Sequence, residues 1–318
     1  MSIAPQTGFS PYGGSPYGGT PYGGHRAQPG FFERLRIGWH LTKSAFGVLR
    51  MDKEILLLPV LSGIAMVLLL AASVGPFLFG LASGAVQGQG AFQTSFYVLL
   101  GVLYVGGAFI TIFFNVAVIH CATIRFDGGD PTVRDGLSFA ANNVGRIFVW
   151  ALFVATVGMA LRMLRERAGF LGQILLAGVE IAWGIATYFV VPILVYRQVG
   201  PVAAIKESAG LIRRTWGEGL AAVGSVGIIT MLLMIPGFLL VVGSIFALAA
   251  TRSFALFGVV LAMGILSILF VAVLQSALNG IVQSALYKYA TTGRIPQAFD
   301  ARDVNPYGAP TPVQARPY

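Results

Sequence analysis

Charge is scarce in this sequence. Only 10% of the 318 residues are Asp, Glu, Lys or Arg, whereas 56% are hydrophobic, and the mean hydropathy is +0.78. A soluble domain carries roughly 25% charged residues, so the polar surface here is too small to cover a water-soluble globule. The apolar residues also come in long runs, which indicates an integral membrane protein.

Residue types that bind metals or carry out catalysis are also few. A single cysteine, Cys121, excludes an internal disulfide framework and a multi-cysteine metal site. The three histidines, His25, His40 and His120, lie far apart and supply no ligand pair. The sequence has no serine elbow, phosphate-binding glycine loop or zinc-binding helix motif. We therefore predict a non-enzymatic protein with no catalytic residues, no metal and no cofactor.

Six apolar runs are long enough to cross a bilayer as helices of about 20 residues. The third run is short and ends in the charged cluster Arg162–Arg167, and the fifth contains Pro236-Gly237, where we expect a kink. The sequence thus predicts an all-α, polytopic transmembrane bundle with a membrane domain over residues 31–290. The six spans lie at about residues 55–81, 96–122, 144–161, 170–196, 220–250 and 254–282.

The distribution of Lys and Arg predicts the orientation. With six spans, 17 of the 21 basic residues fall on the side that holds both termini. The positive-inside rule makes that side cytoplasmic, and the net charge of +9 then faces anionic lipids rather than nucleic acid. We expect a multi-pass protein of the cytoplasmic membrane with cytoplasmic N- and C-termini. The Arg162–Arg167 cluster departs from the rule, and we expect its side chains to reach the outer headgroups.

An amphipathic segment precedes each pair of spans. In residues 31–50, apolar side chains recur at three- and four-residue steps beside a basic stripe, a pattern typical of a helix that lies in the membrane interface. Residues 201–216 repeat this pattern, and residues 132–143 show it more weakly. We call these three segments the elbow helices. The basic residues expected at the membrane surface are Arg36, Lys43, Arg50, Lys206, Arg213 and Arg214.

The elbow helices align with one another. Ser44, Ser138 and Ser208 come into register when the segments are superposed on their sequence pattern. The alignment predicts three parallel repeats in a pseudo-threefold arrangement, each an elbow helix followed by a helical hairpin.

Both ends of the chain are rich in Pro, Tyr and Gly. Residues 10–24 repeat a Pro-Tyr-Gly-Gly-containing pentapeptide three times, and residues 305–318 echo it. Such segments bury too little apolar surface to offset the entropy of ordering, so we expect disordered cytoplasmic tails at 1–30 and 291–318. The tails are either solubilising spacers or a Tyr-based contact surface for a membrane-protein partner or a second copy.

Glu180 is the most informative polar residue of the predicted spans. It lies about 15 Å into the fourth span at 1.5 Å per residue, where an ionised carboxylate is costly. It therefore relays a proton, binds a cation or stays protonated, or else it makes a structural hydrogen bond to a neighbouring helix.

A polar stripe follows the sixth span at four-residue spacing: Gln275, Asn279 and Gln283. This stripe lines a water-filled path or holds helices together, and adjacent small residues favour the second role. The small-residue ladders are Ser276, Gly280 and Ser284 on the sixth span, and Gly178, Ala182 and Ala186 on the fourth. Asn115 and His120 on the second span are candidates for the same polar network.

Three stretches carry a resemblance to a known family. They are residues 52–60 (DKEILLLPV), residues 183–195 (WGIATYFVVPILV), and residues 200–208 (GPVAAIKES) with 214–218 (RTWGE). Together they resemble an uncharacterised family of bacterial and archaeal six-span membrane proteins and, more distantly, the membrane domain attached to some glycerophosphodiesterases. The resemblance implies the six-span topology and supplies no catalytic or ligand-binding residue.

These patterns favour an accessory or scaffold subunit, or a lipid-handling protein, of the cytoplasmic membrane. The first alternative is a transporter or channel with Glu180 and the sixth-span stripe along its path. A lipid-modifying membrane enzyme is the third hypothesis, and it requires residues from the loop at 127–131 to meet a histidine at the interface. That loop alternatively forms a turn that ends in a helix cap at Asp130. The enzyme hypothesis needs convergence among His40, His120, Asp127 and Asp130.

Overall fold

The computed structural model describes residues 31–86, 88–215, 225–300 and 304. Over these residues the chain is helical and contains no strand, which confirms the all-α prediction. The elements are α1 (Phe31–Met51), α2 (Glu54–Ala82), α3 (Gln89–Phe126), α4 (Val133–Asn142), α5 (Val144–Arg167), α6 (Phe170–Ala186), α7 (Val190–Tyr196), α8 (Pro201–Thr215), α9 (Ser225–Thr251) and α10 (Phe254–Thr292).

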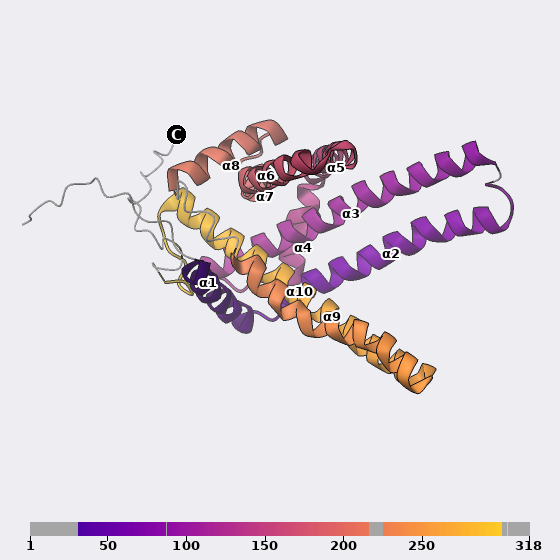
Figure 1. Cartoon of the computed structure of the whole chain (residues 1–318). Coiled ribbons are helices and arrows are strands. Elements are labelled where there is room, and N and C mark those ends of the chain that lie inside the picture. The colour runs from indigo at the N-terminus through magenta and orange to yellow at the C-terminus, as the bar shows by residue number, and fades with distance from the viewer. Residues whose placement is uncertain (1–30, 87, 216–224, 301–303, 305–318) are drawn as a thin grey trace, which may run out of the picture.

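Six helical stretches in the described part of the chain are long and apolar enough to cross a membrane, which indicates a multi-pass membrane protein. They form three hairpins, made by α2 with α3, by α5 with α6 and α7, and by α9 with α10 (Figure 1). The second helices α3 and α10 have 38 and 39 residues and continue well past the predicted spans.

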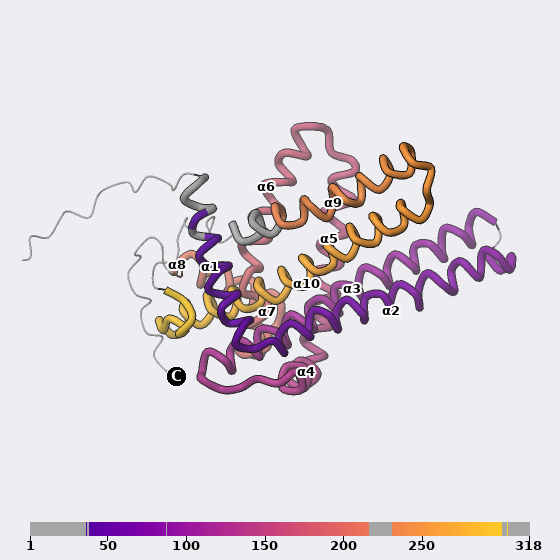
Figure 2. Tube along the Cα trace, turned by 90° about the horizontal axis from the view of Figure 1, so that it is seen from below, coloured from indigo at the N-terminus to yellow at the C-terminus, as the bar shows by residue number. Residues whose placement is uncertain are grey.

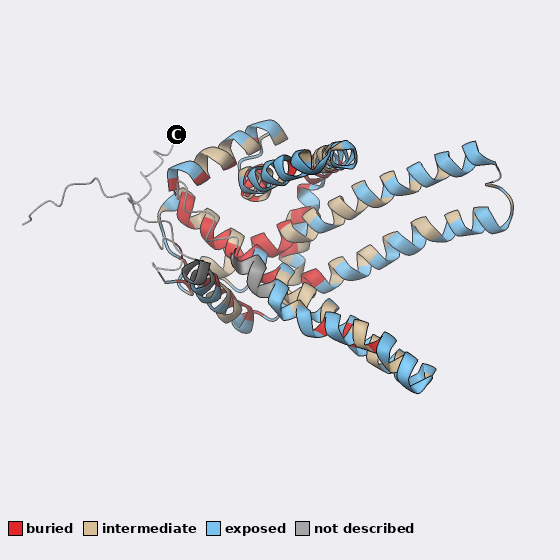
Figure 3. Ribbon diagram, viewed as in Figure 1, coloured by how far each residue is buried: buried red, intermediate tan, exposed pale blue. Residues whose placement is uncertain are grey.

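The three hairpins diverge from a common region, which we call the base. Figures 1 and 2 show α2–α3, α5–α6 and α9–α10 pointing in different directions from it. Buried apolar side chains gather in the base, where α3, α7 and α10 contribute Ile119, Ile193 and Ile281, each at most 1% exposed. The outer parts of the hairpins are largely exposed (Figure 3), as expected for helices that face lipid.

Each elbow helix packs against the hairpin of the preceding repeat, and the first elbow helix packs against the third hairpin. The three contacts form a closed ring. Helix α4 lies on α3 of the first hairpin, and α8 lies on α6 and α7 of the second. Helix α1 lies on α9 and α10 of the third hairpin and so closes the ring. The three repeats therefore interlock, because every elbow helix bridges two hairpins.

The buried positions of the three elbow helices align the repeats differently from the serine alignment. At the end of each elbow helix one polar residue is nearly buried: Asp52 (6% exposed), Asn143 (7%) and Thr215 (5%). Seven residues earlier lie Ala45, Gly136 and Ser208, each buried against the base. The serine alignment fails because Ser44 is only partly buried and Ser138 is exposed.

The C-terminal boundary also differs from the expectation of a disordered tail from residue 291. Helix α10 ends at Thr292, where Gly293 adopts φ 70°, and the chain then folds back onto the base. Phe299 (6% exposed) meets the Phe126 ring edge-on at 5.9 Å, and Val304 is fully buried. Trp216 and the repeat-containing tails at 1–30 and 305–318 lie outside the described residues.

Candidate functional site

The fourth span is broken between α6 and α7. In a continuous helix the N–H of residue 192 donates to the carbonyl of residue 188, but Pro192 has no N–H. Pro192 therefore leaves the Tyr188 carbonyl, which lies in the break at Thr187–Phe189, without its helical donor. We expected one continuous span over residues 170–196, and Pro192 is the residue in the sequence that coincides with the break.

Two side chains of the third repeat bind the backbone at this break. Gln283 on α10 donates from Nε2 to the carbonyl of Tyr188, and the N–H of Phe189 donates to Ser208 Oγ on α8 at 3.0 Å. Backbone polar groups freed within a membrane helix must find partners inside the protein. Gln283 therefore holds α10 to the fourth span, a structural contact of the kind that the sequence analysis favoured for the polar stripe.

A hydrogen-bonded chain joins the second helices of the three hairpins in the base. His120 Nδ1 lies 3.3 Å from the hydroxyl of Tyr196, which donates to Thr123 Oγ1 at 3.2 Å. The Thr123 hydroxyl donates to the carbonyl of Ile119 at 2.8 Å, so it accepts from Ser284 Oγ, which lies 2.9 Å away. The chain ties α3, α7 and α10 together, so His120 belongs to a network within the base, where its ring stacks on Phe139 with centroids 3.8 Å apart.

The remaining polar candidates of the spans lie apart from this chain. Asn115 faces α10 near Gly280, Asn279 is exposed and Gln275 is partly buried. Gly280 itself allows close contact, because a Cβ there would lie 2.5 Å from Val118 Cγ1. The ladder on the fourth span differs, since Gly178 and Ala182 are exposed and pack on no helix of the described chain.

The loop between α3 and α4 is held by ion pairs. Arg125 binds the buried carboxylate of Asp52 and also Asp130, at 2.9 Å, while Lys288 binds Asp127. The two carboxylates of the loop, Asp127 and Asp130, are therefore each paired with a basic side chain. Within the described ranges no three His, Cys, Asp or Glu side chains gather as metal ligands, and His40 lies exposed on α1.

Thr132, and not Asp130, caps α4. Its hydroxyl accepts from the N–H of Asp135, and the Asp135 carboxylate accepts from the Thr132 hydroxyl and N–H. These hydrogen bonds lower the pKa of Asp135 below its ordinary value. The reciprocal cap begins the helix after the turn at Gly128, where φ is 85°.

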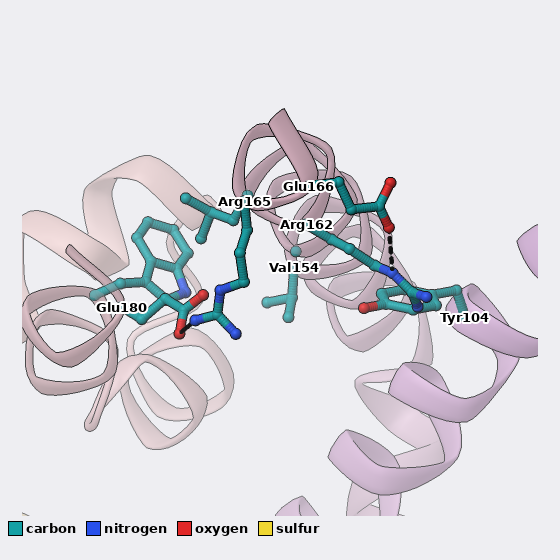
Figure 4. A pocket seen from close by; sticks show the side chains of 9 residues that line it. Tyr104, Val154, Arg162, Arg165, Glu166 and Glu180 are labelled. Atoms are coloured by element: carbon teal, nitrogen blue, oxygen red, sulfur yellow. Dashed lines mark hydrogen bonds and ion pairs between the residues drawn. The ribbon is translucent and has the colours of Figure 1, made fainter. Parts of the chain in front are cut away.

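Glu180 is ion-paired with Arg165 across the second hairpin. The two side chains are 40% and 48% exposed, and Figure 4 shows them pointing toward each other from α6 and α5. A second pair, Arg162 with Glu166 at 3.2 Å, lies on the side of α5 that faces Tyr104 (Figure 4). Arg165 thus turns toward Glu180 of the same hairpin, and its position at the outer headgroups stays a prediction.

These two pairs line a cavity of about 540 Å³ between α3, α5 and α6. Its remaining walls are aromatic and aliphatic and include Tyr104 and Trp183. A second cavity of about 290 Å³ adjoins it at Tyr104 and is lined almost entirely by apolar side chains of α3 and α5. The site therefore combines a charged cavity with an apolar one.

The charges of this site lie near one end of α5. Arg162 is about 27 Å along the helix from Val144, at 1.5 Å per residue, and the hydrocarbon core of a bilayer is about 30 Å thick. If α5 crosses the membrane from its first residue, the guanidinium groups reach the boundary between acyl chains and headgroups.

A comparison with known protein families identifies the family of the chain. The family model described as "Family of unknown function (DUF6159)" matches residues 94–297. The chain belongs to this family. No curated protein and no solved structure gives a significant match.

The DUF6159 match covers the principal candidates described above. Residues 94–297 contain Arg165, Glu180, the break after α6 and the base chain from His120 to Ser284. The match confirms membership of an uncharacterised family. The glycerophosphodiesterase resemblance and the bacterial or archaeal origin stay predictions.

The basic residues of the elbow helices are exposed, as a surface stripe requires. This holds for all six predicted at the membrane surface: Arg36, Lys43, Arg50, Lys206, Arg213 and Arg214.

Proposed function

We propose that this protein is a non-enzymatic, lipid-handling protein of the cytoplasmic membrane that binds a phospholipid between its first and second hairpins. The observation that carries the proposal is the charged cavity beside Glu180, which opens next to an apolar cavity along α5. A volume of about 540 Å³ lies within the range of roughly 300–1,000 Å³ that is typical of small-molecule sites.

The chemistry of the two cavities matches the two parts of a phospholipid. Arg162 and Arg165 offer planar guanidinium groups, which suit phosphate oxygens in bidentate contacts. The second cavity, with Val105, Ala155 and Met159, suits an acyl chain. An apolar tail in one cavity and a phosphate in the other fit a lipid that enters sideways from the bilayer.

The orientation of the site follows from the charge distribution. The exposed basic stripes of α1 and α8 are proposed to lie on the anionic cytoplasmic leaflet, with both termini on that side. The charged cavity then opens at the outer leaflet, because α5 starts in the base and ends beyond Arg165.

Native mass spectrometry of the detergent-purified protein tests the proposal. We expect the wild type to retain a phospholipid and Gly158→Leu to lose it, because Gly158 lines the cavity and a Cβ there has room beside Tyr104 at 3.5 Å. Gly178→Leu is the matched control, since Gly178 is exposed on the same hairpin and does not line the cavity. Equal lipid retention by Gly158→Leu and wild type would contradict the proposal.

A transporter or channel is the second candidate, favoured by the broken fourth span. Discontinuous helices often form substrate sites in transporters. Here, however, the break is bound by Gln283 and Ser208 within the protein. Ion flux into liposomes that depends on Glu180 would favour this candidate over lipid binding alone.

A further inference from the structure

We infer that the charged cavity selects a dipolar phospholipid headgroup, one that carries both a phosphate and an ammonium group. This inference rests on the proposed lipid binding and adds the headgroup class. It follows from the combination of charges in the cavity, which holds two guanidinium groups and two carboxylates.

The cavity is electrically balanced before any ligand enters. Arg162 is paired with Glu166, and Arg165 with Glu180, so the formal charge of the four groups is zero. At the edge of a bilayer, an uncompensated charge is costly because the surroundings have a low dielectric constant. A headgroup of zero net charge keeps the balance, whereas an anionic headgroup adds an unpaired negative charge beside two carboxylates.

The arrangement also offers a place for each end of the headgroup dipole. The two ion pairs lie on opposite sides of the cavity (Figure 4), so a phosphate between the guanidinium groups of Arg162 and Arg165 has a carboxylate on either flank. An ammonium group next to the phosphate then meets Glu166 or Glu180. Tyr104 and Trp183 also line the cavity, and aromatic faces attract ammonium groups.

The carboxylates are what distinguish this site from a plain anion site. A pocket that bound phosphate alone would need the arginines and no acidic partner on each. Arg167, on the same helical turn, does not line the cavity, so the basic residues of this cluster are not equivalent.

The test is competitive lipid binding to the full-length protein in nanodiscs, read out by native mass spectrometry. The probes are phosphatidylethanolamine, phosphatidylcholine and phosphatidylglycerol with identical acyl chains. We expect the two dipolar lipids to outcompete phosphatidylglycerol by about tenfold or more. The two dipolar probes distinguish two modes of recognition. Hydrogen bonds donated by the ammonium N–H groups favour ethanolamine, whereas contact with the aromatic side chains favours choline.

Charge variants supply the decisive comparison. Glu166→Gln and Glu180→Gln each leave the site with a net charge of +1, so the preference should shift toward phosphatidylglycerol by about tenfold. Arg167→Gln is the matched control that changes the charge of the cluster outside the cavity and should leave the preference unchanged. Thermal unfolding of each variant verifies that it is folded.

The outcomes separate this inference from the proposed function. Binding of all three lipids with equal affinity, or an unchanged preference in both Glu→Gln variants, overturns the headgroup inference and leaves lipid binding standing. Absence of any bound phospholipid in the folded wild type overturns both.

Discussion

At the scale of single residues, one proline and one glutamine account for the hydrogen bonding of the Tyr188 carbonyl at the break in the fourth span. Pro192 removes the donor that Tyr188 O would have in a continuous helix, and Gln283 supplies a replacement from another repeat. Polar residues in membrane helices are often read as parts of a pathway. Here the partner of Gln283 is a backbone carbonyl, so the side chain makes a structural contact between α10 and the fourth span.

We predict that Gln283→Leu lowers the free energy of unfolding by about 1–3 kcal/mol, because Tyr188 O loses its donor inside the protein. The cost should shrink in a Pro192→Ala background, where residue 192 regains an N–H and the span can continue. Thermal or denaturant unfolding of the two single variants and the double variant measures this coupling.

Gln275→Leu is the control on the same helix, for which we expect little change. A full, undiminished cost of Gln283→Leu in the Pro192→Ala background would show that the glutamine acts elsewhere.

At the scale of elements, glycines determine how α9 and α10 pair. Helix α9 continues through Pro236, and the neighbouring Gly237 lies against Gly264 of α10. A Cβ on Gly264 would lie 2.8 Å from the backbone nitrogen of Val241 and 3.0 Å from Gly237 O. The Pro236-Gly237 pair, expected from the sequence to mark a kink, therefore lies in a continuous helix at a close contact between the two helices.

We predict that Gly264→Val lowers the free energy of unfolding by about 1–3 kcal/mol, because the added atoms collide with backbone that cannot move away alone. Gly258→Val on the same helix is the matched control, since a Cβ there meets nothing within 4 Å. Unfolding of both variants in detergent measures the difference. Similar stability of the two variants would mean that α9 and α10 do not pack at Gly264.

At the scale of the whole molecule, the interlocked ring explains how three diverging hairpins stay together. The hairpins meet in the base, and each elbow helix bridges from one hairpin to the next. Helix α1 closes the ring by lying on α9 and α10, beside the direct contacts of α10 with α2 and α3.

We predict that Val48→Asn, at a fully buried position of α1, lowers the free energy of unfolding by about 2–4 kcal/mol and loosens α1 from α9 and α10. Hydrogen–deuterium exchange should show faster exchange in α1 and in the base half of α10. Lys43→Asn, at an exposed position of the same helix, is the control and should leave exchange unchanged. Faster exchange in both variants alike would argue against docking through the buried face.

The all-α class and the six apolar helices could be predicted from composition and periodicity, because long apolar runs of span length have few other uses. The family was indicated by the resemblance of particular stretches of residues. The elbow helices could also be predicted, but their register could not. Amphipathic patterns show which residues are apolar, but a one-residue error in the alignment turns the helix face by about 100° and so changes which residues are expected to meet the base. Burial of Ala45, Gly136 and Ser208 resolves this.

The sequence by itself thus determined the all-α class, the six apolar helices and the elbow segments, and it singled out Glu180 and Gln283 as polar candidates within the spans, since each of these follows from local residue order. Only the tertiary structure decided the partners: Arg165 for Glu180, the Tyr188 carbonyl for Gln283, and the preceding hairpin for each elbow helix. Local periodicity carries no information about which distant residues meet. Which residues meet depends on how whole helices pack. The packing of α5 and α6 brings Glu180 to Arg165, so that its carboxylate lines a cavity whose charges are balanced.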